Sequence, residues 1–401
     1  MTTTVLAVYG TRPEAIKMAP VIKALEHSAT LHCQIAVTGQ HREMLDQVNE
    51  MFAIVPDHDL NVFEPGQTLN ALMAKVFARI DPVLEQVAPK AVLVQGDTST
   101  VAAAAIAAMY RQIPVVHLEA GLRSGDIWSP FPEEANRKIV SQITSLHLAP
   151  TTQSRDNLLR EGISADDIVV TGNTVIDALF TTLGMNPPVS HPQVAELVEQ
   201  GKKILLVTTH RRENWGGAME NVGRALRTIA QNFPEMTIVL PAHRNPLVRE
   251  AVLPSVEGLP NVLVTEPLSY GEFIRVMNAA HIVLTDSGGV QEEAPSLGRP
   301  VLVMRENTER PEAVAAGTVR LIGTDEARIV DEVSRLMTSQ TSYDAMSKAQ
   351  NPYGDGKAAA RTVAAIEQLL GLGQRIEDFS VDRPAPRTVN VEGSASLRGE
   401  H

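Results

Sequence analysis

The sequence predicts an α/β protein with two doubly wound, mostly parallel sheets, each in a domain of its own. Short β-rich runs alternate with helical segments along the chain, which is typical of repeated βαβ units. At 401 residues the chain exceeds one ordinary domain, because a prior of about 150 residues per domain gives two or three. Residues 184–192, with three prolines and a glycine, interrupt the alternation and indicate a linker. We therefore predict one domain over residues 1–183 and a second over residues 193–356.

The first domain is expected to begin with an apolar strand over residues 5–9, followed by a helix over residues 13–26. Apolar side chains at helical spacing indicate that helix, and they are Ile16, Ala19, Ile22 and Leu25. An alanine-rich segment, residues 100–110, predicts a further helix. The remaining strands of this sheet are predicted at residues 34–38, 91–95, 115–118, 146–149 and 168–171.

The second domain follows the same pattern and ends in a helix and a tail. Its strands are predicted at residues 203–208, 237–241, 262–264, 282–285 and 301–304. A final helix is expected over residues 357–370, because Gly371 directly after it suits a helix C-terminus. Residues 373–401 contain prolines, scattered charge and no periodicity, which predicts a disordered tail. Since ligands bind at the carboxyl ends of strands in such sheets, we expect the site between the domains.

Composition excludes some classes of partner. The net charge of −12 argues against a nucleic-acid partner, which would require a basic face. A local group of cationic side chains could still bind a small anion. The single cysteine, Cys33, excludes an internal disulfide and fits a reducing compartment. No signal peptide is recognisable, and no apolar stretch approaches the length of about 20 residues that spans a bilayer. We therefore expect a soluble, cytoplasmic protein with no membrane partner.

The segment Asp286 to Gly298 carries the strongest functional signal. It lies between two apolar runs, which predicts a strand, a glycine-rich turn, a short helix and a second strand. Ser287, Gly288 and Gly289 would leave backbone N–H groups open at the start of the helix, where the helix dipole favours an anion. Glu293 lies about one turn further on, where its carboxylate could accept hydrogen bonds from a ribose. The combination suits a nucleotide diphosphate.

A second candidate anion site follows the first strand. Arg12 lies in the predicted turn and Lys17 on the helix after it, so both could donate charge-assisted hydrogen bonds to a diphosphate. The alternative is that both are solvated surface charges. Only one glycine, Gly10, is present in this turn, so the G-x-G-x-x-G pattern of dinucleotide binding is absent. We therefore expect no tightly held NAD.

Acidic side chains follow the predicted strands of the first domain. Asp97 and Glu119 each come directly after a strand, while Glu133 opens a helix that carries Arg137 one turn later. Carboxylates at strand ends point into the ligand crevice, and neighbouring carboxylates raise one another's pKa. A carboxyl tuned in this way can act as a general acid or base near neutral pH. For Asp97 or Glu133 alone, helix capping is the simpler interpretation, but it does not account for three acids together.

Two further cationic candidates come after strands of the second domain. His210 follows the strand at 203–208, where ligands are expected, although a single histidine there can equally be structural. Arg310 follows the strand at 301–304 and could bind a diphosphate or a carboxylate. The sequence lacks C-x-x-C, H-E-x-x-H, G-x-S-x-G and P-loop patterns, so no metal is expected.

Taken together, these segments resemble the non-hydrolysing UDP-N-acetylglucosamine 2-epimerase family. The matching runs follow the family's order over about residues 5 to 360 and begin at Gly10, Gln40, Gly96, Glu119, Pro132, Gly172, His210, Thr285 and Glu309. The resemblance implies a GT-B fold, which consists of two Rossmann-like domains with the active site in the cleft between them. It also implies that the helix at 357–370 crosses back onto the first domain, and that the protein is a homodimer.

The activity implied by the resemblance is interconversion of UDP-GlcNAc and UDP-ManNAc without an added cofactor, supplying ManNAc for cell-surface polysaccharide. The C2 proton of the sugar is not next to a carbonyl, so UDP must leave first, giving a 2-acetamidoglucal that is then re-protonated. By resemblance, acid/base function and sugar orientation belong to Asp97, Glu119, Glu133, Arg137 and His210. The nucleotide would be bound by Arg12, Lys17, Phe273, Ser287, Gly288, Gly289, Glu293 and Arg310, with Phe273 near the uracil. Which carboxylate takes the proton is left open.

Bacterial members can be activated by a second UDP-GlcNAc molecule beside the active site. By resemblance, that site would be lined by Gln40, Gln67, Arg211 and His243. Some relatives carry an arginine where this chain has Gly66, and many have a glycine where it has Thr209. The alternatives to the epimerase are a GT-B glycosyltransferase that uses a UDP-sugar, a hydrolysing 2-epimerase that releases free ManNAc, and a non-catalytic UDP-sugar sensor.

Overall fold

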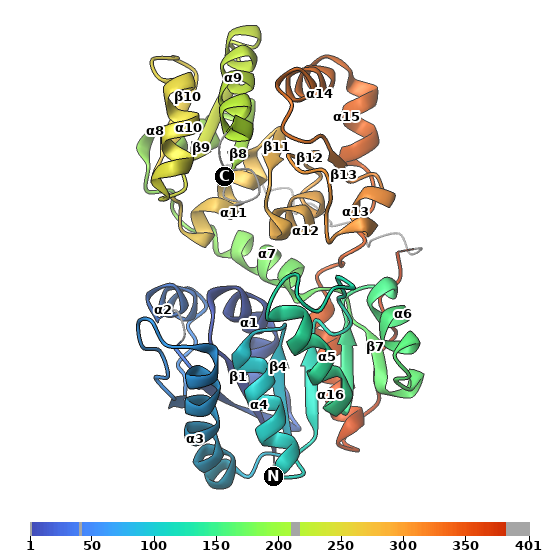
Figure 1. The fold of residues 1–401 in the computed structure, drawn as a ribbon. Helices are drawn as coiled ribbons and strands as arrows, with labels where there is room; N and C mark the ends of the chain where they lie inside the picture. The colour runs from blue at the N-terminus through green and yellow to red at the C-terminus, as the bar shows by residue number, and fades with distance from the viewer. Residues whose placement is uncertain (1, 40–41, 210–216, 382–401) are drawn as a thin grey trace, which may run out of the picture.

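The computed structural model describes residues 2–39, 42–209 and 217–381 (Figure 1). These residues form two parallel sheets of seven and six strands, which confirms the α/β architecture expected from the sequence. Figure 1 shows the two sheets one above the other, each flanked by helices. No helix within the described ranges is long and apolar enough to cross a membrane.

The first sheet has its first strand near the centre. In sheet order its strands are β3 (His58–Asp59), β2 (Leu31–Val37), β1 (Thr3–Tyr9), β4 (Ala91–Gln95), β5 (Val115–Leu118), β6 (Leu146–Ala149) and β7 (Ile168–Val170). The helices of this half are α1 (Arg12–Glu26), α2 (Arg42–Met51), α3 (Leu69–Val87), α4 (Ser99–Tyr110), α5 (Glu133–Ile143), α6 (Thr152–Arg160) and α7 (Thr174–Met185), with a short 3₁₀ turn at Ala165–Asp167.

The second sheet has the same central crossover. Its strands in sheet order are β10 (Val262–Thr265), β9 (Thr237–Pro241), β8 (Ile204–Thr208), β11 (Ile282–Thr285), β12 (Val301–Val303) and β13 (Val319–Leu321). Its helices are α8 (Pro192–Gln200), α9 (Gly217–Asn232), α10 (Pro246–Val256), α11 (Tyr270–Ala279), α12 (Gly288–Ser296), α13 (Pro311–Ala315), α14 (Glu326–Thr338) and α15 (Gln340–Ser347). In both sheets the order reverses beside the first strand, which creates a crevice at the carboxyl edge.

Strand β1 shows why the central strands are continuously apolar. Val5 and Ala7 pack in one core cluster with α1, whereas Leu6 and Val8 pack in another with α3 and α4. Alternate side chains of a strand point to opposite faces of the sheet, and helices cover both faces here. All four side chains are therefore fully buried, and the run has no polar face.

Helix α7 lies between the two halves and packs against both. Val175, Ile176 and Ala178 belong to the core of the first sheet, whereas Leu179 belongs to a core cluster of the second. The helix contacts α1 on one side and both α11 and α12 on the other (Figure 1). The domain boundaries at 183 and 193 stay a prediction, because α7 contributes to both cores.

The last helix, α16 (Ala358–Leu369), packs on the first sheet although it follows the second in the chain. The carboxylate of Asp177 on α7 accepts hydrogen bonds from the backbone N–H of Ala358 at 3.2 Å and of Ala359 at 2.8 Å. A helix start has unpaired N–H groups, and Asp177 satisfies two of them. This contact fixes the point at which α16 returns to the first half.

The prediction of disorder from residue 373 is wrong for residues 373–381. Phe379 is only 5% exposed, and its N–H donates to the carbonyl of Val170 on β7 at 2.7 Å. In return, the N–H of Val170 donates to Asp378 Oδ2 at 3.2 Å. Strand β7 lies at the edge of its sheet, so its backbone groups are open to such a partner. The predicted disorder of residues 382–401 lies outside the described part of the chain.

Two strands were not expected, and both are marginal. Strand β3 has only two residues and no apolar run, while β13 is a three-residue edge strand. Neither contains enough apolar residues for periodicity to reveal it. Each is recruited by pairing with a longer neighbour, β2 and β12 respectively.

Candidate active site

A cavity of about 560 Å³ lies between the two halves of the molecule. Its lining includes eight residues that the sequence proposed as ligand-binding, which are Arg12, Lys17, His243, Phe273, Ser287, Gly289, Glu293 and Arg310. They come from α1, from the loops after β9 and β12, and from the start of α11 and α12. The strand ends therefore converge on one cavity, as doubly wound sheets require.

The start of α12 offers open backbone donors to this cavity. Ser287 is the N-cap residue, and its side chain makes no capping bond. Gly288 and Gly289 form the first turn, so their N–H groups have no partner within the helix. The positive end of the helix dipole adds to this polarity, and the arrangement suits a phosphate group.

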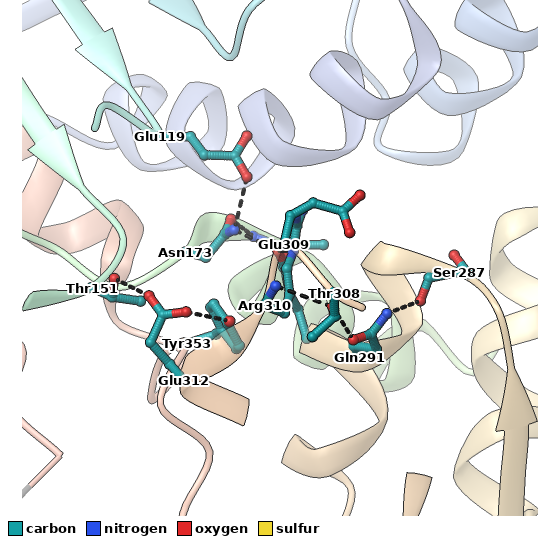
Figure 2. A network of polar contacts seen from close by, with 12 residues as sticks. Glu119, Thr151, Asn173, Ser287, Gln291, Thr308, Glu309, Arg310, Glu312 and Tyr353 are labelled. Atoms are coloured by element: carbon teal, nitrogen blue, oxygen red, sulfur yellow. Dashed lines mark hydrogen bonds and ion pairs between the residues drawn. The ribbon is translucent and has the colours of Figure 1, made fainter. Parts of the chain in front are cut away.

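Gln291 connects this turn to the segment that carries Arg310. Its Nε2 donates to the carbonyl of Ser287 at 3.1 Å, and its Oε1 accepts from Thr308 Oγ1 at 2.7 Å (Figure 2). Thr308 Oγ1 in turn accepts from the backbone N–H of Arg310 at 3.1 Å. Gln291 is fully buried, so its amide fixes the position of the two sides of the anion site relative to each other.

Glu293 lies deeper along α12 and is only 6% exposed. Burial raises the pKa of Glu293 to about 7, and the neighbouring Glu292 adds to this, while a hydrogen bond from Tyr270 opposes it. Tyr270 on α11 donates its hydroxyl to Glu293 Oε1 at 3.0 Å. The carboxyl expected to bind a ribose is therefore oriented by a tyrosine that the sequence did not single out.

Arg310 is held at the cavity by a buried carboxylate. Its Nε donates to Glu292 Oε1 at 2.6 Å, and Glu292 is 1% exposed. Burial disfavours a charged guanidinium, but Glu292 and Glu119 outweigh this and raise the pKa of Arg310. The cation therefore stays charged in a buried position, where it can stabilise an anionic ligand.

The segment that carries Arg310 is also held by hydrogen bonds to Glu312, one of which comes from the first half of the molecule. Glu312, two residues further on, accepts a hydrogen bond from Thr151 Oγ1 at 2.9 Å and another from the hydroxyl of Tyr353 at 3.0 Å (Figure 2). Thr151 caps α6, whereas Tyr353 belongs to the return segment before α16. Glu312 thus holds the Arg310 loop against two separate parts of the fold.

Arg137 on α5 pairs with two acids of the first half. Arg137 donates to Asp97 Oδ2 at 2.6 Å and to Glu134 Oε2 at 2.9 Å. Burial raises the pKa of Asp97, and Glu119 and Glu133 add to this while Arg137 opposes it. Glu133 itself has one carboxylate oxygen, Oε2, that is buried without a hydrogen-bond partner among the described residues. The charge of Glu133 thus acts on Asp97.

Glu119 is the most densely bonded of these acids. It accepts hydrogen bonds from Lys17 Nζ at 2.5 Å, from Gln95 Nε2 at 2.5 Å and from Asn173 Nδ2 at 3.1 Å. Burial alone would raise the pKa of Glu119, but the Lys17 ammonium outweighs it and holds the value below the usual range. Glu119 is therefore ionised at neutral pH in the ligand-free protein.

Glu119 does not itself line the cavity but pairs with Lys17, which does, and local backbone geometry places it there. Its φ is 65°, in the left-handed region that side-chain-bearing residues seldom adopt. Two residues later Gly121 has φ 91°, and a Cβ there would lie 2.2 Å from the carbonyl oxygen of Ser154. Only glycine permits this turn, which leads the chain from β5 towards α5 and its acids.

Three predicted residues, His210, Arg211 and Gln40, lie outside the described residues. Gln67 is described, but it does not line the cavity and instead accepts a hydrogen bond from Lys75 at 3.3 Å. Within the described ranges, no group of three or more His, Cys, Asp or Glu side chains could hold a metal ion.

Sequence reasoning did not single out Glu292, Asn173, Tyr270 and Glu312. One signal was present for Glu292: three consecutive polar residues, Gln291 to Glu293, occupy a short helix between two buried strands. A helix in that position must bury most of its faces, so some of these polar groups need buried partners. Asn173 lies in the matching run that begins at Gly172, but nothing in the sequence indicated its role or that of Tyr270, because their partners are distant in sequence.

Comparison with known proteins identifies the family of this chain. A family model for UDP-N-acetylglucosamine 2-epimerase matches residues 23–367. The chain is 53% identical over 369 residues to a probable UDP-N-acetylglucosamine 2-epimerase of Ralstonia nicotianae, covering 90% of this chain and 98% of that protein. It is 50% identical over 368 residues to the UDP-N-acetylglucosamine 2-epimerase of Yersinia pestis, with the same coverage of 90% and 98%.

A solved structure has a similar fold. The crystal structure of UDP-GlcNAc 2-epimerase from Neisseria meningitidis bound to UDP-GlcNAc is 45% identical and has a TM-score of 0.81, covering 92% of this chain and 100% of that one. These matches confirm the family and the GT-B fold that the motifs indicated. The chain therefore belongs to the UDP-N-acetylglucosamine 2-epimerase family.

Proposed function

We propose that this enzyme interconverts UDP-GlcNAc and UDP-ManNAc by eliminating UDP to a 2-acetamidoglucal and adding it back. One observation supports this most strongly. Glu119 is joined through Asn173 and Glu292 to Arg310, so an ionised carboxylate lies close to the cation expected to bind the diphosphate. Elimination requires this proximity, because the proton leaves C2 while the nucleotide leaves the adjacent carbon, C1.

The first half-reaction breaks two bonds and forms two, a C=C bond in the sugar and an O–H bond on the carboxylate. The C1–O bond breaks with its electron pair going to the β-phosphate oxygen, the C2–H bond gives its proton to a carboxylate, and the C1=C2 double bond forms. Arg310, Lys17 and the start of α12 would stabilise the charge on the departing diphosphate. Donors already held in position need no reorganisation when that charge develops.

The return half-reaction delivers a proton to the opposite face of C2. The phosphate oxygen then re-forms its bond to C1, which inverts C2 and leaves C1 as it was. Two acids on different sides of the intermediate would serve as base and acid, and we assign these roles to Asp97, which pairs with Arg137, and Glu119, which pairs with Lys17. His210 remains a predicted participant, and the glucal must be retained between the two half-reactions.

Deuterium incorporation tests the mechanism directly. The protein is incubated with UDP-GlcNAc in deuterated water, and the products are identified by mass spectrometry and NMR. Deuterium at C2 in a mixed pool of UDP-GlcNAc and UDP-ManNAc is the expected result. Free ManNAc with UDP would instead indicate a hydrolysing enzyme, and sugar transfer only when an acceptor is added would indicate a glycosyltransferase. Absence of C2 exchange would refute the mechanism.

We also propose that the enzyme is a homodimer that supplies ManNAc for cell-surface polysaccharide and is activated by a second UDP-GlcNAc. The position of His243 in the cavity lining supports activation, since it puts one of the four predicted residues beside the nucleotide site. Light scattering after size exclusion tests the dimer. A rate that rises more than linearly with UDP-GlcNAc tests activation, and a hyperbolic curve would contradict it.

A further inference from the structure

Asn173 occupies an unusual position between two buried carboxylates. Its Nδ2 donates to Glu119 Oε1 at 3.1 Å (Figure 2). The same nitrogen donates to Glu292 Oε2 at 3.0 Å. Glu119 belongs to the first half of the molecule and Glu292 to the second, on α12. One neutral amide group therefore bridges the two halves, and of the two carboxylates it holds, Glu292 lines the cavity.

The amide of Asn173 has no freedom to turn. Its Oδ1 accepts from the backbone N–H of Val175 at 3.1 Å, which makes Asn173 the N-cap of α7. Its backbone N–H donates to the carbonyl of Tyr353 at 2.6 Å, and the residue is 3% exposed. A primary amide has two N–H donors, and each is taken by one of the carboxylates. The orientation of Glu119 is thus tied to the start of a helix.

Each of the two carboxylates that accept a hydrogen bond from Asn173 also forms an ion pair with a cation. Lys17 pairs with Glu119 at 2.5 Å, and Arg310 pairs with Glu292 at 2.6 Å. Both cations line the cavity where the diphosphate is expected. A diphosphate that attracts Lys17 and Arg310 would weaken both ion pairs at once, and Asn173 would remain as a fixed neutral donor to both carboxylates.

We propose that Asn173 is a positioning residue for the epimerisation, which holds Glu119 in its reactive orientation and couples it to the Glu292–Arg310 pair that binds the diphosphate. The inference rests on the proposed function. It assigns no contact with substrate to Asn173, whose role is exerted through the carboxylates it holds.

The proposal predicts a pH effect, so the groups around Glu119 must be considered. The charged or titratable groups that act on it or on its partners are Lys17 on α1, Asp97 after β4, His117 on β5, Glu292 on α12, Glu309 and Arg310 before α13, and Tyr353 before α16. A substitution at Asn173 replaces none of these side chains, although Glu292 loses the same donor as Glu119. A hydrogen bond donated to a carboxylate favours its ionised form, so removing the donor raises the carboxyl pKa. In a plot of activity against pH, the limb that depends on the ionisation of Glu119 then moves to higher pH. This holds whether Glu119 gives or takes the proton.

Two substitutions separate positioning from capping. Serine and aspartate are both good N-cap residues, so Asn173→Ser and Asn173→Asp retain a cap for α7. Serine is too short to bridge the carboxylates, whereas aspartate keeps the shape of asparagine but replaces both donors with a third negative charge. Asn351→Ser is the matched control, because Asn351 is also buried but donates to the backbone carbonyl of Glu292 and to Ser296 rather than to a carboxylate.

The experiment measures C2 deuterium exchange against pH, the KM for UDP-GlcNAc and the thermal melting temperature for the full-length protein and its variants. For Asn173→Ser we expect kcat to fall about tenfold or more with a smaller change in KM, and the profile to move up by about one pH unit. For Asn173→Asp the fall in kcat should be larger at pH 8. It should become smaller towards pH 6, where the new carboxyl can be protonated and donate one hydrogen bond. Asn351→Ser should lower the melting temperature and leave the pH profile in place.

The outcomes distinguish failure of this inference from failure of the proposed function. A wild-type protein without C2 exchange would overturn both. An active wild-type enzyme, together with a folded Asn173→Ser variant that keeps kcat and the pH profile, would show that Asn173 only caps α7. A profile shift of equal size in Asn351→Ser would also overturn the positioning role, because that variant leaves both carboxylate contacts of Asn173 intact.

Discussion

Replacing Tyr270 by phenylalanine tests the electrostatics of the nucleotide site. The hydroxyl of Tyr270 donates to Glu293 Oε1 at 3.0 Å, and this bond opposes the effect of burial, which raises the pKa of Glu293 to about 7. In the wild-type protein the ionised fraction of Glu293 therefore falls from about 90% at pH 8 to about 10% at pH 6. If the carboxylate form binds the ribose hydroxyls, affinity falls about tenfold over that range.

Tyr270→Phe should move the pH dependence of UDP-GlcNAc binding to higher pH. Without the tyrosine donor the charged carboxylate is less stabilised, and a loss of about 1.4 kcal/mol corresponds to a rise of about one pKa unit. At pH 7 the ionised fraction then falls from about a half to about a tenth. Binding of UDP-GlcNAc should accordingly weaken about fivefold at pH 7 and recover as the pH approaches 9.

Calorimetric titration with UDP-GlcNAc between pH 6 and 9 measures this, in an Asp97→Asn background that prevents turnover. UDP-GlcNAc is preferable to UDP, whose terminal phosphate itself titrates near pH 6. Tyr353→Phe is the control, because Tyr353 also donates to a glutamate at 3.0 Å, but that glutamate is Glu312. The control should leave the midpoint unchanged. An affinity that does not vary with pH, or an equal midpoint shift in both variants, would refute the reasoning.

Four further outcomes are expected. Asp97→Asn should lower C2 deuterium exchange by about 10²–10⁴-fold while UDP-GlcNAc still binds, and near-normal exchange would exclude Asp97 from proton transfer. Arg310→Lys keeps the charge but loses the guanidinium geometry, so calorimetry should show about tenfold weaker UDP binding; unchanged affinity would contradict the diphosphate role. Burial lowers the pKa of His147 to about 3, from about 6.5 when unfolded, so the unfolded state binds more protons below pH 6.5 and stability falls there. His147→Leu should therefore lose less melting temperature between pH 7 and pH 5 than wild type, and parallel losses would argue against this. Phe379→Ala should lower the free energy of unfolding by about 3 kcal/mol in urea titrations, because Phe379 is 5% exposed, and no change would contradict the docking of residues 373–381.

Most strands were predictable because a buried parallel strand must be apolar on both faces. The runs at 91–95, 115–118, 237–241 and 282–285 coincide with β4, β5, β9 and β11 residue for residue. The helix at 357–370 was likewise predicted to within one residue at each end. What periodicity could not detect were β3 and β13, which are short edge strands formed by pairing.

The tail was mispredicted for a related reason. Residues 373–381 lack any period, which is typical of disorder. Their order comes from outside the segment, since Phe379 fills a site on the fold and bonds to the edge strand β7. A one-dimensional pattern carries no information about an open sheet edge about 200 residues earlier in the chain.

The sequence by itself determined the fold class, the family and the residues around which the site is built, because strand ends, glycine turns and clustered charges are local features of the chain. Arg12, Lys17, Glu293 and Arg310 could be proposed from position alone, and they line one cavity. Only the tertiary structure decided how these groups are paired: Lys17 with Glu119, Arg310 with Glu292, and Asn173 between the two carboxylates. These contacts join residues 18 to 119 positions apart, so burial and charge pairing act on them only once the chain has folded, and the Asn173–Glu292 bond forms only when the two halves have come together.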